Sequence, residues 1–124
     1  MAPYQLAQEF VNLRWGTMMP IAVMVNSNIV QLRARGNFSA IVADPARLSA
    51  EIPDPENIAS FLQSFAVITI TDMIGMQSRS ASDVRQLTTV TAQTVQTFQA
   101  ELDAKFNSIG MKLKDASIDA IESV

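Results

Sequence analysis

Histidine and cysteine, the side chains most often used in active sites, are both missing from this chain of 124 residues. Their absence excludes thiol nucleophiles, disulfides, zinc sites built from cysteine and histidine, and general-base catalysis by histidine. Catalysis by carboxylates, lysine or serine stays open in principle, so the spacing of the acidic residues decides whether they could act together. The composition therefore favours binding or assembly over catalysis.

Two pairs of acidic residues are close enough in sequence to be weighed for acid–base chemistry or metal binding. Glu101 and Asp103 fall in a predicted helix, where residues two apart point to different sides, so we interpret them as solvated surface acids. Asp115 and Asp119 fall in a predicted strand and could share one face, but no third ligand accompanies them. We therefore expect no catalytic residue, no metal and no cofactor.

Two arginines, Arg33 and Arg35, alternate with polar residues on one side of a predicted strand. They could form a basic stripe for an acidic partner or a phospholipid head group, or they could be the solubilising charges of a wet sheet face. The net charge of −3 and the lack of a basic run argue against nucleic acid as a partner. Met18 and Met19 could be an exposed, adaptable interface, although methionines more often fill a core.

Alternation of apolar and polar residues predicts the strands that must position these side chains. Strands are predicted over 10–15, 18–25, 29–43 and 111–123. The pattern is longest in 29–43, where Gly36 predicts a bend or bulge. In the first strand, Val11, Leu13 and Trp15 share the apolar face. A one-residue phase slip predicts a bulge near Lys114 in the last strand.

Helix-start signals follow the long strand. Asp44-Pro45 and Asp54-Pro55 each join a capping aspartate to a proline at the first helical position. Helices are predicted over 45–51, 55–77 and 89–108, and Gly110 ends the last. Ser82 or Asp83 could cap a further helical turn. In the second helix we predict a stripe of Ile58, Phe61, Leu62, Phe65, Ile68, Asp72, Met73 and Met76; in the third, one of Val95, Phe98, Leu102, Phe106 and Ile109.

These elements predict a single α+β domain over 1–124, with helices packed on one face of a mainly antiparallel sheet. The amino terminus does not match a signal peptide. The most apolar stretch, 58–76, contains several polar residues and one acid, so we interpret it as a buried helix and not a membrane span. We expect a cytoplasmic location, with any membrane anchor outside this chain.

Two stretches, RWGTMMPI and VQLRARGNFSAIVADPARL, resemble the SPFH superfamily, also called band 7, which includes stomatins, prohibitins, flotillins and bacterial relatives. The pattern is most similar to a bacterial subgroup described as virion-core-protein-like. The matching residues are Trp15, Gly16, Thr17, Pro20, Ile21, Val30, Leu32, Arg33, Ala34, Gly36, Phe38, Ser39, Asp44 and Pro45, followed by Gly110, Leu113, Asp115, Ile118 and Ile121. The chain departs from the subgroup at 22–25 and 42–43, where apolar residues replace polar ones.

The resemblance implies an SPFH-like fold and a non-catalytic scaffold that is peripheral to the membrane. It implies homo-oligomers in the full-length protein, membrane association through segments outside this chain, and structural roles for Trp15, Gly16, Gly36, Asp44, Pro45 and Gly110. It also implies a partial domain, because the amino-terminal strands of a full SPFH domain are not matched. Two other functions stay open: a small ligand-binding or regulatory domain, with a pocket between helices and sheet, and an enzyme that uses only carboxylates and lysine.

Overall fold

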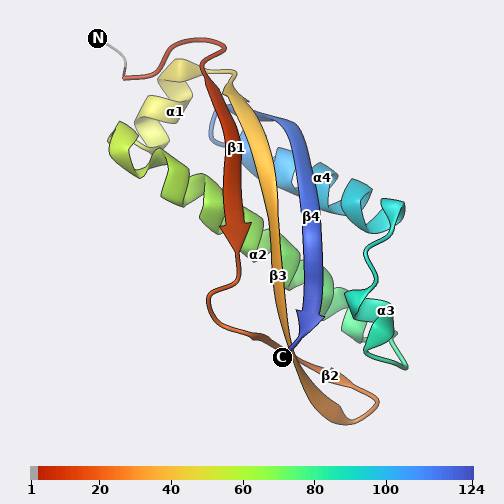
Figure 1. Cartoon of the computed structure of the whole chain (residues 1–124). Helices are drawn as coiled ribbons and strands as arrows, with labels where there is room; N and C mark the ends of the chain where they lie inside the picture. The colour runs from red at the N-terminus through yellow and green to blue at the C-terminus, as the bar shows by residue number, and fades with distance from the viewer. Residues whose placement is uncertain (1–2) are drawn as a thin grey trace.

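The computed structural model describes residues 3–124 and shows a sheet on one side with helices on the other (Figure 1). The strands are β1 (Glu9–Gly16), β2 (Ile21–Val25), β3 (Asn28–Val42) and β4 (Met111–Ser123). The helices are α1 (Pro45–Glu51), α2 (Ile58–Ser78), α3 (Arg85–Thr88) and α4 (Ala92–Asn107), with a 3-10 turn, η1 (Pro55–Asn57), before α2. All strand pairs are antiparallel. The predicted α+β class is confirmed.

The long strand β3 is the centre of the sheet. Residues 35–41 pair with β1 and residues 32–42 pair with β4, so these two strands flank β3 on opposite sides. β2 pairs with residues 28–32 through a tight hairpin, whose turn residues Asn26 and Ser27 both have positive φ. Positive φ at both central residues gives the turn twist that matches the strands of a two-residue hairpin.

β1 and β2 lie one after the other along the same edge of β3, because Leu32 pairs with Ile21 of β2 on one side and Ser123 of β4 on the other. A short loop separates them. Thr17 bridges this gap: its backbone N–H donates to the Ala34 carbonyl at 3.0 Å, and its hydroxyl accepts from the Ala34 N–H at 3.1 Å. The predicted start of β2 at Met18 is wrong; the strand begins after Pro20, which has no N–H for the ladder.

The prediction of which β1 side chains are buried is partly wrong as well. Val11 was expected to be buried, but 56% of its surface is exposed. The register shifts between Phe10 and Leu13, and Asn12 has a φ of 54°. This bulge reverses the alternation, so that Phe10 packs on the core together with Leu13 and Trp15.

The capping signals are confirmed at the helix starts. The Asp44 carboxylate accepts from the backbone N–H of Arg47 at 3.1 Å, and Asp54 accepts from Glu56 at 3.0 Å. The β-branched run inside α2 is helical as expected. Its Thr69 and Thr71 hydroxyls each donate to a carbonyl one turn earlier at 2.7 Å, which satisfies them without a strand partner.

The buried face of α2 differs from the predicted stripe. The buried residues are Ile58, Leu62, Ala66, Thr69, Ile70, Met73 and Ile74. Of the predicted stripe, Phe61, Ile68 and Met76 are 46%, 48% and 65% exposed. The helix is apolar around much of its circumference, so its sequence offers two stripes, and contact with the sheet selects the one that contains Ala66 and Ile70.

α4 covers β4 and closes the core with the predicted stripe. Phe98, Leu102 and Phe106 are fully buried, and the Phe106 ring lies 5.5 Å from that of Phe38. β4 carries the predicted bulge, because the register passes from Ser39–Asp115 to Ala40–Leu113. A second bulge at Asp119 was not predicted, and it turns Ile121 instead of Ala120 inward.

Candidate functional site

The sheet face opposite the helices is open and carries charges of both signs. Arg33 and Arg35 both lie on it and are exposed, as predicted. Arg35 forms an ion pair with Glu122 on β4 at 3.4 Å, while none of the ion pairs within residues 3–124 uses Arg33. The face is therefore mixed and not a basic stripe. Lys114 pairs with Glu9 at 3.1 Å near its other end.

One residue of each acidic pair weighed for chemistry is engaged in hydrogen bonds to the protein. Asp103 is half-buried and accepts from the Leu113 N–H at 3.0 Å, so it caps the free edge of β4 instead of being a solvated surface acid. Asp119 accepts from the Ser117 hydroxyl at 3.2 Å and from the Asn37 amide at 3.4 Å. Within residues 3–124, no three acidic side chains are grouped to hold a metal ion.

Trp15 and Gly36 form a tight contact at the centre of the sheet. They are cross-strand partners, and a methyl group added at Gly36 would lie 2.8 Å from Cζ2 of the indole and against the carbonyl oxygen of Ser117. The indole also packs on Phe98, with ring centroids 5.1 Å apart. Its Nε1 is buried without a hydrogen-bond partner among the described residues, so the contact rests on packing alone.

Gly110 closes the turn between α4 and β4 against the start of α1. Its φ is +89°, and its carbonyl accepts the N–H groups of Ala43 and Asp44 at 2.8 and 2.9 Å. A methyl group here would lie 2.6 Å from the Asp44 carbonyl oxygen, so only glycine fits. Asp44 thus caps α1 with its side chain and bonds to the turn before β4 with its backbone, and Pro45 begins the helix.

A groove of about 860 Å³ runs between the β1–β2 edge and α2. Residues 14–22 form one wall, and Ser60, Gln63, Ser64, Val67, Ile68 and Thr71 form the other. The Gln63 amide donates to the Arg14 carbonyl at 2.6 Å and covers the sheet edge at one end. Met18 and Met19 at the rim are 94% and 81% exposed, which agrees with the interface interpretation of these two residues.

The hairpin beyond the groove is apolar on its outer face. Met24 and Ile29 are cross-strand partners, and 61% and 74% of their surfaces are exposed. Figure 1 shows this hairpin projecting from one end of the molecule, near the carboxyl terminus. The loop between β1 and β2 that carries Met18 and Met19 is called the methionine loop. The hairpin, the methionine loop and Arg33 therefore lie toward the same end of the sheet.

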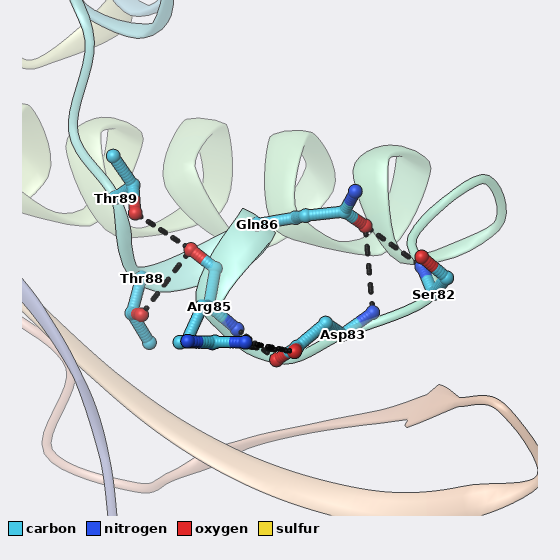
Figure 2. Close-up of polar contacts among 6 residues, drawn as sticks. All are labelled: Ser82, Asp83, Arg85, Gln86, Thr88 and Thr89. Atoms are coloured by element: carbon cyan, nitrogen blue, oxygen red, sulfur yellow. Dashed lines mark hydrogen bonds and ion pairs between the residues drawn. The ribbon is translucent and has the colours of Figure 1, made fainter.

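The pKa shifts within the described chain have local structural causes. Burial, with a smaller effect of Asp54, raises the pKa of Tyr4, whose hydroxyl donates to the Ile52 carbonyl at 2.8 Å. The Arg85 guanidinium lowers the pKa of Asp83, whose carboxylate also accepts from the Arg85 backbone N–H at 2.9 Å. The N-cap of α3 is Val84, which makes no side-chain capping bond, and not Ser82 or Asp83 as predicted. Figure 2 shows this exposed cluster of hydrogen bonds, which orders the turn before α3.

Comparison with known families identifies the chain. The model of the SPFH domain–Band 7 family matches residues 4–123. The chain belongs to the SPFH/band 7 family. No curated protein matches it at significant similarity.

The predicted resemblance is thus confirmed at the level of the family, which is generally of a non-enzymatic scaffold type. In this band 7 domain the motif residues perform packing and turn functions: Trp15 over Gly36, Asp44 and Pro45 at the start of α1, and Gly110 beneath it. Gly16 ends β1 in a less crowded place, where an added methyl group would meet its nearest atom at 3.7 Å.

Within residues 3–124, one helix is long and apolar enough to cross a membrane. The segment Pro55–Ser78 meets that criterion by length and composition alone, with a mean hydropathy of 1.5. It packs on β1, β2 and α4, as the core helix of a soluble domain does. The residues that sequence reasoning missed are Gln63, Gln99 and Asp103, whose side chains cap backbone groups of distant strands and leave no local signal.

Proposed function

We propose that this chain is a non-catalytic module of a membrane-associated scaffold that forms homo-oligomers. The observation that carries the proposal is the band 7 match over residues 4–123. Large exposed apolar side chains on the methionine loop, the hairpin and α2 support it, because assembly surfaces are apolar patches with polar rims. We place the protein in the cytoplasm, peripheral to the membrane. Within the family we propose the virion-core-protein-like subgroup, on the motif from Trp15 to Pro45.

Arg33 is the basic residue best placed to meet lipid head groups, with Arg35 beside it. Arg33 is exposed, and its charge is not used in an ion pair within residues 3–124, whereas Arg35 is paired with Glu122. The exposed Met24 and Ile29 lie further along the same face, so apolar and cationic groups are presented together. In our proposal this end faces the membrane, while the main anchor lies in segments outside this chain.

Vesicle co-sedimentation tests the lipid contact. Neutralising one cation near an anionic surface costs about 1 kcal/mol, so Arg33→Gln should weaken binding to phosphatidylserine vesicles roughly fivefold. Arg79→Gln removes the same charge from the exposed end of α2 and is the matched control. If Arg33→Gln and Arg79→Gln bind the vesicles equally, the proposed lipid contact of Arg33 is wrong.

Light scattering with and without lipid tests assembly. Full-length protein should form large particles at concentrations where a globular control of similar mass stays monomeric. A full-length protein that is monomeric and indifferent to vesicles would overturn the scaffold proposal.

The groove favours a second function, that of a small ligand-binding or regulatory domain. Its volume of about 860 Å³ falls in the range of ligand sites, and Met19 and Ile68 give it an apolar lining. Native mass spectrometry of the purified protein separates this function from the scaffold: a bound molecule of defined mass on a monomer would favour ligand binding. Val67→Trp, which fills the groove, should then release that molecule.

A further inference from the structure

The outer face of α2, which includes Ile68 of the groove wall, carries apolar side chains that the fold leaves exposed. Phe61, Ile68 and Met76 are 46%, 48% and 65% exposed along it. The 21 residues of α2 contain a single charged residue, Asp72. A surface helix ordinarily directs charged side chains to water, so this face has the composition of a contact surface.

Gly75 adds a second, independent observation. It lies inside α2, where glycine costs roughly 1 kcal/mol relative to alanine. A methyl group added there would meet nothing within 4 Å, so neither crowding nor a positive φ in the described chain requires glycine. The open space where a side chain of residue 75 would stand is called the gap. It lies on the exposed side of the helix, and it would admit a side chain from another molecule.

The exposed face is complementary to itself. Phe61, Ile68 and Gly75 are spaced by seven residues, so they lie along one line of the helix. If two α2 helices meet antiparallel with Ile68 on the two-fold axis, Phe61 of each helix lies opposite Gly75 of the other. The same register places the Asp72 carboxylate opposite the Ser64 hydroxyl. The largest side chain thus faces the gap, and the one charge faces a polar residue, Ser64, whose hydroxyl donates to the Ser60 carbonyl of its own helix at 2.9 Å.

We propose that two copies of this chain pack antiparallel through the outer faces of α2, with Ile68 at the two-fold axis. A second copy fits better than a charged partner, because the face offers only Asp72 for charge pairing, and that residue is in no ion pair within residues 3–124. The inference rests on the proposed scaffold function, for which it supplies one contact surface. A contact of one helix per copy is small, so it is weak alone and gains strength by repetition in a larger assembly.

Disulfide trapping tests the register directly, since the chain has no cysteine of its own. Ile68→Cys places two thiols at the axis, where facing helices bring Cα atoms within the roughly 4.4–6.8 Å that a disulfide needs. Under mild oxidation this variant should form covalent dimers at least tenfold faster than Gln96→Cys, an exposed position on α4. Equal rates in the two variants would overturn the proposal.

Gly75→Ala tests the gap, with two readouts measured on the same protein. Sedimentation equilibrium should show self-association weakened roughly tenfold, because the methyl group occupies the space for Phe61. Thermal unfolding of the dilute monomer should show no loss of stability, since the methyl group meets no atom of its own chain. A stabilised monomer with unchanged self-association would overturn the proposal.

The α2–α2 contact and the scaffold function are refuted by different results. If full-length protein assembles, but Ile68→Cys is not trapped and Gly75→Ala associates normally, this contact is wrong and the scaffold function stands. If full-length protein is monomeric and does not bind vesicles, both are wrong.

Discussion

Replacing Gly36 of β3 with alanine should destabilise the domain more than the same replacement of Gly16 in β1. Gly36 is buried between two partner strands, opposite Trp15 on β1 and Ile118 on β4. The new methyl group would press on the carbonyl oxygen of Ser117 and approach Trp15 Cζ2 to 2.8 Å. Contacts this short force either the β3–β4 ladder or the indole to move.

Neither neighbour can move freely. The indole is 3% exposed and packs on Phe98, and Ser117 belongs to a strand held on its far side by the Gln99 amide through the Ala116 carbonyl at 2.8 Å. Overpacking a tight core costs about 1–3 kcal/mol, and the backbone clash places Gly36→Ala near the upper end. For a domain of this length, a loss of about 3 kcal/mol lowers the melting temperature by roughly 10 °C.

Urea unfolding followed by tryptophan fluorescence measures this loss, because Trp15 is the single tryptophan of the chain and touches the site. Gly16→Ala is the matched control, since its methyl group would lie 3.7 Å from the nearest atom and should change stability by no more than about 0.5 kcal/mol. If Gly36→Ala unfolds with a free energy within about 0.5 kcal/mol of the native protein, the packing argument for the Trp15–Gly36 motif is wrong.

Three other changes test the core and the pKa shifts of Tyr4 and Asp83. Leu102→Ala, at a fully buried position, should cost about 2–5 kcal/mol in urea unfolding, and a loss under about 0.5 kcal/mol would contradict its core position. Because the pKa of Tyr4 is raised in the fold, its contribution is complete below pH about 10 and declines as the pH rises toward the folded value, so the alkaline decline in stability should be smaller in Tyr4→Phe. Because the pKa of Asp83 is lowered, its contribution is present above the unfolded value and disappears as the pH falls through the folded one. The stability of Asp83→Asn should therefore converge with that of the native protein in acid, and a constant difference would contradict the pairing with Arg85.

Local patterns predicted most of the fold because the elements here carry their own signals. The alternation in β3 requires one wet and one dry face, and the structure has both over residues 31–36, whereas Ser39 further along the predicted wet face is buried. The two Asp-Pro starts satisfy backbone N–H groups within two or three residues, so their chemistry is complete in the local sequence. The exposure of Arg33 and Arg35 follows from the same alternation.

The errors arose where the outcome depends on distant residues. The bulge at Asn12 is stabilised by the hydroxyl of Ser39, which accepts its N–H at 3.0 Å from 27 residues away. The pairing of Arg35 with Glu122 depends on the register between β3 and β4, which two bulges set. A periodic pattern along one strand does not contain that register.

Part of the stripe predicted to be buried on α2 is exposed, and this has a physical reason. A helix that is apolar around much of its circumference needs cover on more than one side, whereas one sheet and one helix cover only part of α2. The sheet buries the side with Ala66 and Ile70, because small and β-branched residues allow close approach, and it leaves Phe61 and Ile68 outside. A domain that acted alone would gain solubility from charges at those positions, yet Asp72 is the single charged residue of the helix. The sequence of α2 offers two apolar stripes, and the sheet buries only one of them. The stripe that stays exposed is therefore the surface at which a second molecule would complete the burial of α2.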